Sequence, residues 1–171
     1  MIPDQFKKFL WTIPEISINM LPVTPKKVTK VVEIAKNSNK VVVLCSYIRT
    51  AKTISDYLAR EKIKAFVVTG QVFDKNTVLQ NFRKYERQAV LIMSPVGERD
   101  IDLPEAEKLV VFDCVRTVKT VYQRIKRIRG GHSIFLFYAD TYEAKKVHSV
   151  ISDLIERYPW STKLLEKKEV S

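Results

Sequence analysis

The sequence predicts an α/β fold of three layers, in which helices cover both faces of a mostly parallel sheet of five to six strands. The prediction rests on the alternation of two kinds of segment and on the composition of the shorter ones. Short, wholly apolar runs rich in β-branched residues alternate with longer amphipathic segments along the chain. Strands that are apolar on both sides are typical of a parallel sheet buried under helices on both faces.

Residues 1–24 are predicted to form an irregular N-terminal arm, because Pro3, Pro14 and Pro22 interrupt them. The arm is rich in aromatic residues, so we expect it to pack on the domain or on a partner. A domain is predicted over 25–158, followed by a polar, frayed tail over 159–171.

The first predicted helix starts at Pro25 after Thr24 as N-cap and runs to about Asn37. The remaining elements follow from apolar periodicity. We expect strands at 40–45, 64–69, 89–93, 108–113 and 132–138, and helices at 50–61, 75–85, 118–129 and 141–158. The connection between the third and fourth strands, SPVGERDIDLPEAE, has no helical period, and its length indicates a functional loop.

The charge of the chain favours a polyanionic partner. Thirty Lys and Arg residues against nineteen Asp and Glu residues give a net charge of +11. Nucleic acid is the leading candidate, but a generally basic protein explains the same charge equally well, since net charge reports on association and not on fold.

The sequence lacks the patterns of a zinc site, a signal peptide and a membrane-spanning helix. Cys45 and Cys114 end apolar runs, as buried thiols do, and neither they nor His132 and His148 have the spacing of a zinc site. The sequence has no signal-peptide pattern and no apolar run of membrane-spanning length. We therefore expect a cytoplasmic protein in a reducing compartment, which binds no metal and does not associate with a membrane.

Polar residues follow the predicted strands, where ligands of parallel α/β sheets bind. Hydroxyl, glycine, amide and arginine groups recur there and suit phosphate: Ser46, Tyr47, Arg49, Gly70, Gln71 and Ser94. Ordinary loop polarity would scatter the same residue types over both edges of the sheet. The chain contains neither GxxxxGK[ST] nor an Asp-Glu dipeptide, so Mg-ATP hydrolysis by this chain alone is not expected.

From about residue 24 to 158, the chain resembles the second RecA-like domain of superfamily 2 helicases, in particular the Hef and Fanconi-anaemia M branch. VVVLCSYIRTAKTISDYLAREKIKAFVVTGQ resembles motif IV with the following helix and the GQ loop. VLIMSPVGERDIDLPEAEKLVVFD resembles the motif V region, and VYQRIKRIRGG stands where QRxGRxGR of motif VI is expected.

The resemblance implies roles for individual residues. Ser46, Tyr47, Arg49, Gly70, Gln71 and Ser94 would line the track of the nucleic-acid backbone. Gly97 and Asp102 would lie near the nucleotide, while Gln123, Arg124 and Arg127 would face a γ-phosphate held by a first RecA domain, with Arg127 at the arginine-finger position. ATP and Mg would then bind only together with such a partner domain.

The sequence departs from the family pattern in motif VI, where Lys126 and Arg129 replace the two glycines, and in motif V, where Arg99-Asp100 replaces Glu-Gly. Three hypotheses remain open: a helicase-like DNA-binding module of repair or fork processing without its own ATPase activity, the second half of a working DNA helicase, and a partner-docking scaffold without a nucleic-acid role. Expected partners are single-stranded or branched DNA and a protein that supplies a first RecA domain or a repair nuclease.

Overall fold

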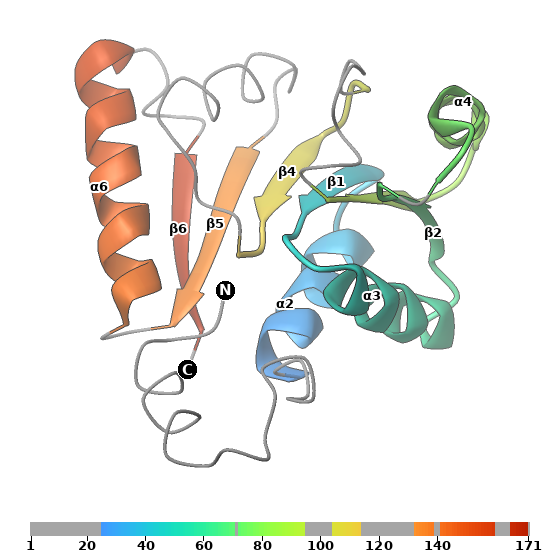
Figure 1. Ribbon diagram of the computed structural model, residues 1–171, viewed down its shortest axis with the longest axis horizontal. Helices are drawn as coiled ribbons and strands as arrows, with labels where there is room; N and C mark the ends of the chain where they lie inside the picture. The colour runs from blue at the N-terminus through green and yellow to red at the C-terminus, as the bar shows by residue number, and fades with distance from the viewer. Residues whose placement is uncertain are drawn as a thin grey trace.

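The structure, a computed structural model, describes residues 25–70, 72–94, 104–113, 132–138, 141–159 and 165–170. The predicted N-terminal arm and the helix predicted over 118–129 lie outside these residues. Within them, six strands form one sheet in the order β2-β3-β1-β4-β5-β6, and all five strand pairs are parallel (Figure 1). The predicted three-layer α/β fold is confirmed.

The strands fall close to their predicted positions. They are β1 (Lys40–Leu44), β2 (Lys64–Val68), β3 (Ala89–Met93), β4 (Lys108–Val111) and β5 (His132–Tyr138). The helices are α2 (Pro25–Lys36), α3 (Ile48–Arg60), α4 (Lys75–Lys84) and α6 (Tyr142–Arg157). Strand β4 ends two residues before the prediction and α3 begins two residues before it.

The predicted frayed tail was wrong over 165–170, because these residues form the sixth strand, β6 (Leu165–Val170), parallel to β5. Its charged sequence, LEKKEV, suits the outermost strand of a sheet, where charged side chains discourage pairing with other chains. Val170 at its end is 3% exposed and packs in the core beneath α2 and α3.

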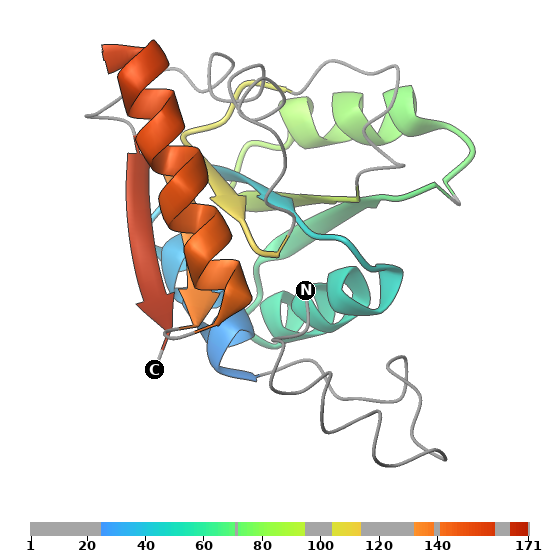
Figure 2. The same ribbon diagram turned by 60° about the vertical axis from the view of Figure 1, so that its left-hand side comes forward.

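Helices cover both faces of the sheet (Figure 2), and an apolar core lies beneath them on each face. Alternate strand residues point to alternate faces. Val42 and Leu44 belong to the core under α4 and α6, whereas Val41 and Val43 belong to the core under α2 and α3. The central strands are therefore apolar at every position for a physical reason: neither of their faces meets water.

Candidate functional site

The carboxyl ends of the strands β1 to β4 lie level at one edge of the sheet, here called the carboxyl edge. Leu44 at the end of β1 pairs with Met93 of β3 and Val111 of β4, and Val68 of β2 also pairs with Met93. The residues that follow these strands are consequently brought together from four separate parts of the chain. They include the predicted residues Ser46, Tyr47, Arg49, Gly70 and Ser94.

A buried carboxylate holds the turn after β1. The backbone N–H of Ser46 donates to Oδ1 of Asp113 at 2.7 Å, and Asp113 is 3% exposed. The N–H of Cys45 donates to Met93 O at 3.0 Å, and that of Phe112 to Leu44 O at 2.9 Å. The turn is thus tied to both neighbouring strands, which gives the start of α3 a defined position.

A buried lysine of α2 supports the same edge from the layer that also contains α3. Lys27 of α2 is 3% exposed; its ammonium donates to the carbonyl of Phe112 and lies 5.0 Å from the ring centroid of Phe112 and 5.4 Å from that of Tyr138. Charged groups are buried only when such partners satisfy them. Neither Lys27 nor Asp113 was among the residues singled out in the sequence, although an acid directly after an apolar run, as in KLVVFD, is a usable signal for Asp113.

The first residues of α3 are open to solvent. Tyr47 is the N-cap in extended conformation and its side chain makes no capping hydrogen bond. Tyr47 and Ile48 are each 46% exposed, and Arg49 is exposed as well. The first N–H groups of a helix have no partner within the helix and carry partial positive charge, so this end favours an anion.

Gly70 and Ser94 occupy the predicted edge with different exposure. Gly70 is exposed after β2. Ser94 is 5% exposed, and its N–H donates to Val68 O at 3.2 Å. Ser94 therefore supports the end of β2, and its direct contact with a ligand stays a prediction. Gln71, Gly97, Asp102, Gln123, Arg124 and Arg127 lie outside the described residues, so their predicted roles stay predictions too.

Cations occupy the first turns of three helices that begin at this edge. Lys26 lies in the first turn of α2, Arg49 in that of α3 and Lys75 in that of α4, and none of these turns contains an acidic residue. Helices ordinarily favour acidic residues there, and a cation at this position costs about 0.3–1 kcal/mol. At the start of α4 the N-cap Asp74 offsets Lys75, so the positive charge at this edge comes from the starts of α2 and α3.

Cys45 is not a candidate nucleophile. Its thiol is fully buried, and burial, followed by the nearby Asp113 carboxylate, raises its pKa well above the usual range. A reactive cysteine needs a lowered pKa and access to solvent. Among the described residues no group of His, Cys, Asp and Glu is arranged to hold a metal ion, and no helix is long and apolar enough to cross a membrane.

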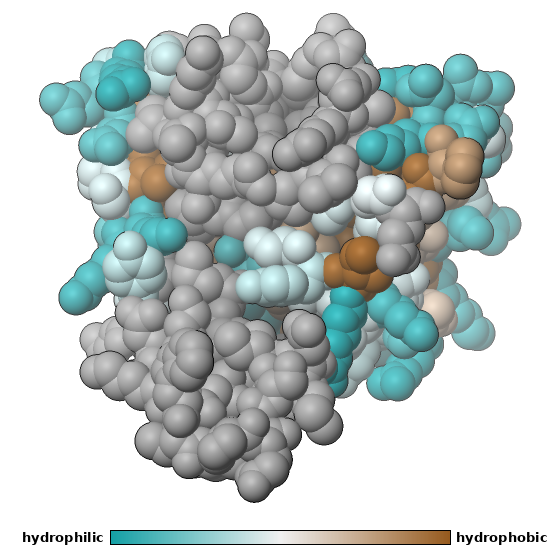
Figure 3. All heavy atoms as spheres, viewed as in Figure 1, coloured by the Kyte–Doolittle hydropathy of each residue, from teal (hydrophilic) through white to brown (hydrophobic). Residues whose placement is uncertain are grey.

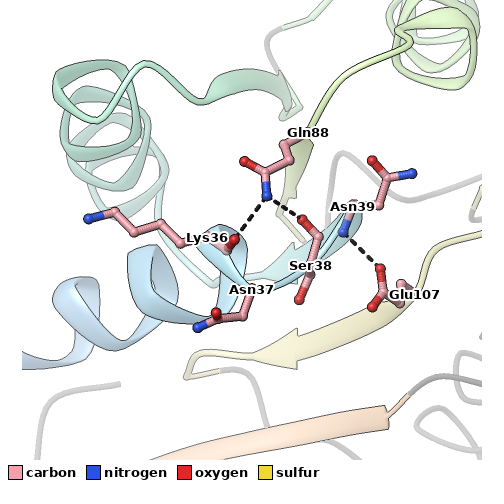
Figure 4. A pocket seen from close by; sticks show the side chains of 6 residues that line it. All are labelled: Lys36, Asn37, Ser38, Asn39, Gln88 and Glu107. Atoms are coloured by element: carbon pink, nitrogen blue, oxygen red, sulfur yellow. Dashed lines mark hydrogen bonds between the residues drawn. The ribbon is translucent and has the colours of Figure 1, made fainter.

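A shallow polar pocket of about 370 Å³ lies at the opposite edge, where the strands begin (Figure 4). Gln88 donates from Nε2 to the carbonyls of Lys36 at 2.9 Å and Ser38 at 3.0 Å. The N–H of Asn39 donates to Glu107 Oε2 at 2.8 Å. These bonds join the end of α2 and the residues between α2 and β1 to the starts of β3 and β4, so the residues that line the pocket stabilise the fold.

Comparison with known proteins decides the family. The model of the helicase conserved C-terminal domain matches residues 25–131, more than half of the chain. The chain belongs to this family. It is a helicase C-terminal domain with a RecA-like α/β fold.

Solved helicase structures share this fold. The C-terminal domain of the DEAD-box protein Dbp5 superposes with a TM-score of 0.65 at 16% identity, over 85% of this chain and 84% of that one. The yeast DEAD-box splicing factor Prp28 gives 0.67 at 19% identity, over 83% of this chain and 32% of that one. The Hef helicase domain of Pyrococcus furiosus gives 0.53 at 27% identity, over 80% of this chain and 28% of that one. No curated protein sequence matches the chain.

Proposed function

We propose that this helicase C-terminal domain binds the phosphate backbone of nucleic acid along its carboxyl edge, as a module of DNA repair or replication-fork processing. The observation that carries the proposal is the cationic first turn of α2 and of α3, neither of which contains an acidic residue. Helix starts and Lys or Arg side chains are the groups that contact phosphates without reading sequence. The net charge of +11 supports the same partner.

A similar structure supports nucleic acid as the class of partner. Domain 2 of the DEAD-box helicase Mss116p, with a TM-score of 0.60 at 16% identity, was solved bound to an RNA duplex. The likeness to Hef, at 27% identity, is the reason for placing DNA before RNA in this proposal. The two nucleic acids are compared directly in the experiments below.

A charge reversal at the carboxyl edge tests the proposal. Arg49→Glu removes a cation from the first turn of α3, and its matched control, Arg83→Glu, makes the same change of net charge in the last turn of α4. We expect Arg49→Glu to weaken binding of single-stranded DNA about tenfold or more, and Arg83→Glu to weaken it by less than about threefold. Equal losses in the two variants would show that binding follows net charge alone and would refute the proposed track.

The dependence of DNA affinity on salt concentration is a second test of the proposed phosphate contacts along the carboxyl edge. Contacts with about four to six phosphates of a single strand predict a log–log slope of affinity against salt near −3 to −4, and loss of the Arg49 contact reduces its magnitude by about 0.7. Fluorescence anisotropy with DNA and RNA strands of one sequence measures both the slope and the preference. An unchanged slope in Arg49→Glu would place the contacts elsewhere.

We further propose that the chain hydrolyses no ATP by itself. The absence of GxxxxGK[ST] and of an Asp-Glu dipeptide supports this proposal. DNA-stimulated phosphate release should stay at background for the chain alone. Turnover in a mixture with a first RecA domain, lost in Arg127→Ala, would establish the motor hypothesis in place of the module without ATPase activity.

A further inference from the structure

A fully exposed aromatic ring projects from the loop between β2 and α4. Phe73 has a relative exposure of 106%, whereas the next most exposed large hydrophobic residues of the described structure reach 46%. Burying a phenylalanine side chain is favourable, because it removes a large apolar surface from water. The folded domain leaves this stabilisation unused at Phe73.

The position of Phe73 makes its exposure notable. Asp74 is the N-cap of α4, so Phe73 directly precedes the cap and Val78 is the fourth residue of the helix. A hydrophobic pair at these two positions ordinarily packs together as a staple. Val78 packs against the core under α4 and α6, but the full exposure of Phe73 shows that the staple is not made.

The backbone that carries the ring is nevertheless held on both sides. The side chain of Asp74 accepts from the N–H of Thr77 at 3.1 Å and from its hydroxyl at 2.6 Å, and the N–H of Val72 donates to Thr69 O at 3.1 Å. Hydrogen bonds among Asp74 and Thr77 also lower the pKa of Asp74, so the cap is charged and intact at neutral pH. A ring on a fixed support loses little conformational entropy when it binds a partner.

The residues around Phe73 favour a nucleic acid over a protein as its binding partner. Phe73 follows Gly70 of the proposed track and precedes Lys75, and α4 has no acidic residue in its sequence KNTVLQNFRK. The space-filling view shows small hydrophobic patches separated by hydrophilic side chains around α3 and α4 (Figure 3). The Asp74 carboxylate next to the ring is engaged by Thr77, and an exposed ring close to Lys75 suits a flat, polar-edged base attached to phosphates, whereas an apolar protein surface needs a contiguous patch.

We propose that Phe73 stacks on an unpaired nucleobase of the strand whose backbone lies along the carboxyl edge. The inference rests on the proposed function and deepens it, because stacking selects single-stranded regions over duplex. A base–aromatic stack contributes about 1–3 kcal/mol, which is about 5- to 150-fold in affinity.

The experiment compares a single strand of about 12 nucleotides with a strand of equal length made only of abasic sites. Phe73→Ala should weaken binding of the base-containing strand about 5- to 150-fold and change binding of the abasic strand less than about twofold. Phe73→Trp should bind the base-containing strand with the affinity of the wild type, and this strand should quench the fluorescence of the introduced indole. Phe73→Leu, which keeps an apolar side chain without a π-face, should behave like Phe73→Ala.

Three results would overturn the stacking proposal: equal losses of both strands in Phe73→Ala, unchanged affinity for both, or full restoration by Phe73→Leu. Failure of the proposed function has a different signature, since the wild-type domain would then bind neither strand with a steep salt dependence. Urea unfolding of each variant verifies the fold, and the exposure of the ring predicts midpoints equal to that of the wild type.

Discussion

At the scale of single residues, the end of α3 shows a local conflict between sequence and backbone. Lys62 has φ = 59°, in the left-handed region. Its N–H donates to Ala59 O at 3.0 Å and the N–H of Ile63 donates to Leu58 O at 2.9 Å, which together form the Schellman motif that ends many helices. Glycine is the usual residue at this position, because a Cβ atom is unfavourable there.

Replacing Lys62 by glycine should stabilise the domain. The left-handed conformation costs a non-glycine residue about 1–2 kcal/mol, and the greater freedom of glycine in the unfolded chain offsets part of this gain. We expect Lys62→Gly to raise the free energy of unfolding by about 1 kcal/mol in urea titrations. The control Lys62→Ala should show no comparable gain, and a gain of equal size there would contradict the backbone explanation.

Asp74 links stability to pH at the start of α4. Hydrogen bonds from the Thr77 hydroxyl and N–H lower the pKa of Asp74 below its ordinary value of 3.8. A lowered pKa in the folded state contributes stability that is present above 3.8 and is lost as pH falls through the folded-state pKa. The wild type should thus exceed Asp74→Asn in urea midpoint at pH 7, and the excess should fade as the pH falls below 3.8.

Asparagine is a suitable comparison at position 74, because it caps helices well without titrating. Thr77→Val removes the hydroxyl donor and should reduce the pH-dependent part of the excess. If the excess of the wild type grew as the pH fell, the assigned direction of the Asp74 pKa would be wrong.

At the scale of whole elements, most of the fold follows from patterns in the sequence. Val41 to Leu44 are apolar without a break because both faces of β1 are buried, and this pattern predicts a central strand. Strand β6 escaped prediction because Glu166, Lys167 and Glu169 are exposed at the sheet edge, where an apolar pattern is unnecessary. Patterns reveal strands that need burial, and β6 is fixed by pairing with β5.

The site was less predictable than the fold. The residue types after the predicted strands placed Ser46, Arg49 and Gly70 at the carboxyl edge, and their contact with a ligand stays a prediction. The bond between Ser46 and Asp113 joins residues 67 positions apart and requires β1 to lie beside β4. No local pattern encodes that strand order, so a contact that depends on it cannot be read from the residues nearby.

Strand β6 should contribute measurably to stability through Val170. This residue is 3% exposed in the core under α2 and α3. We expect Val170→Ala to lower the free energy of unfolding by about 1–2 kcal/mol, whereas the exposed neighbour Glu169→Ala should lower it by less than about 0.5 kcal/mol. Equal effects of the two variants would indicate that β6 is not packed on the domain.

At the scale of the whole molecule, the proposed binding surface and the hydrogen bonds of Gln88 lie at opposite edges of the sheet. The carboxyl edge carries the proposed track, and the edge where the strands begin holds Gln88 with its bonds to Lys36 and Ser38. Gln88→Ala should lower the free energy of unfolding by about 1 kcal/mol, since a side-chain hydrogen bond typically contributes this amount. Its affinity for single-stranded DNA should equal that of the wild type, and a loss of affinity would show that the two edges are coupled.

The strand order has a consequence for synthesis on the ribosome. Strand β1 leaves the ribosome before the other strands, yet it lies between β3 and β4, which follow dozens of residues later. At about 5–20 residues per second, the nascent chain carries an unpaired apolar segment for several seconds before a neighbour is available. During this interval the segment is exposed to aggregation, so factors that shield nascent chains should raise the yield of folded domain most at high expression.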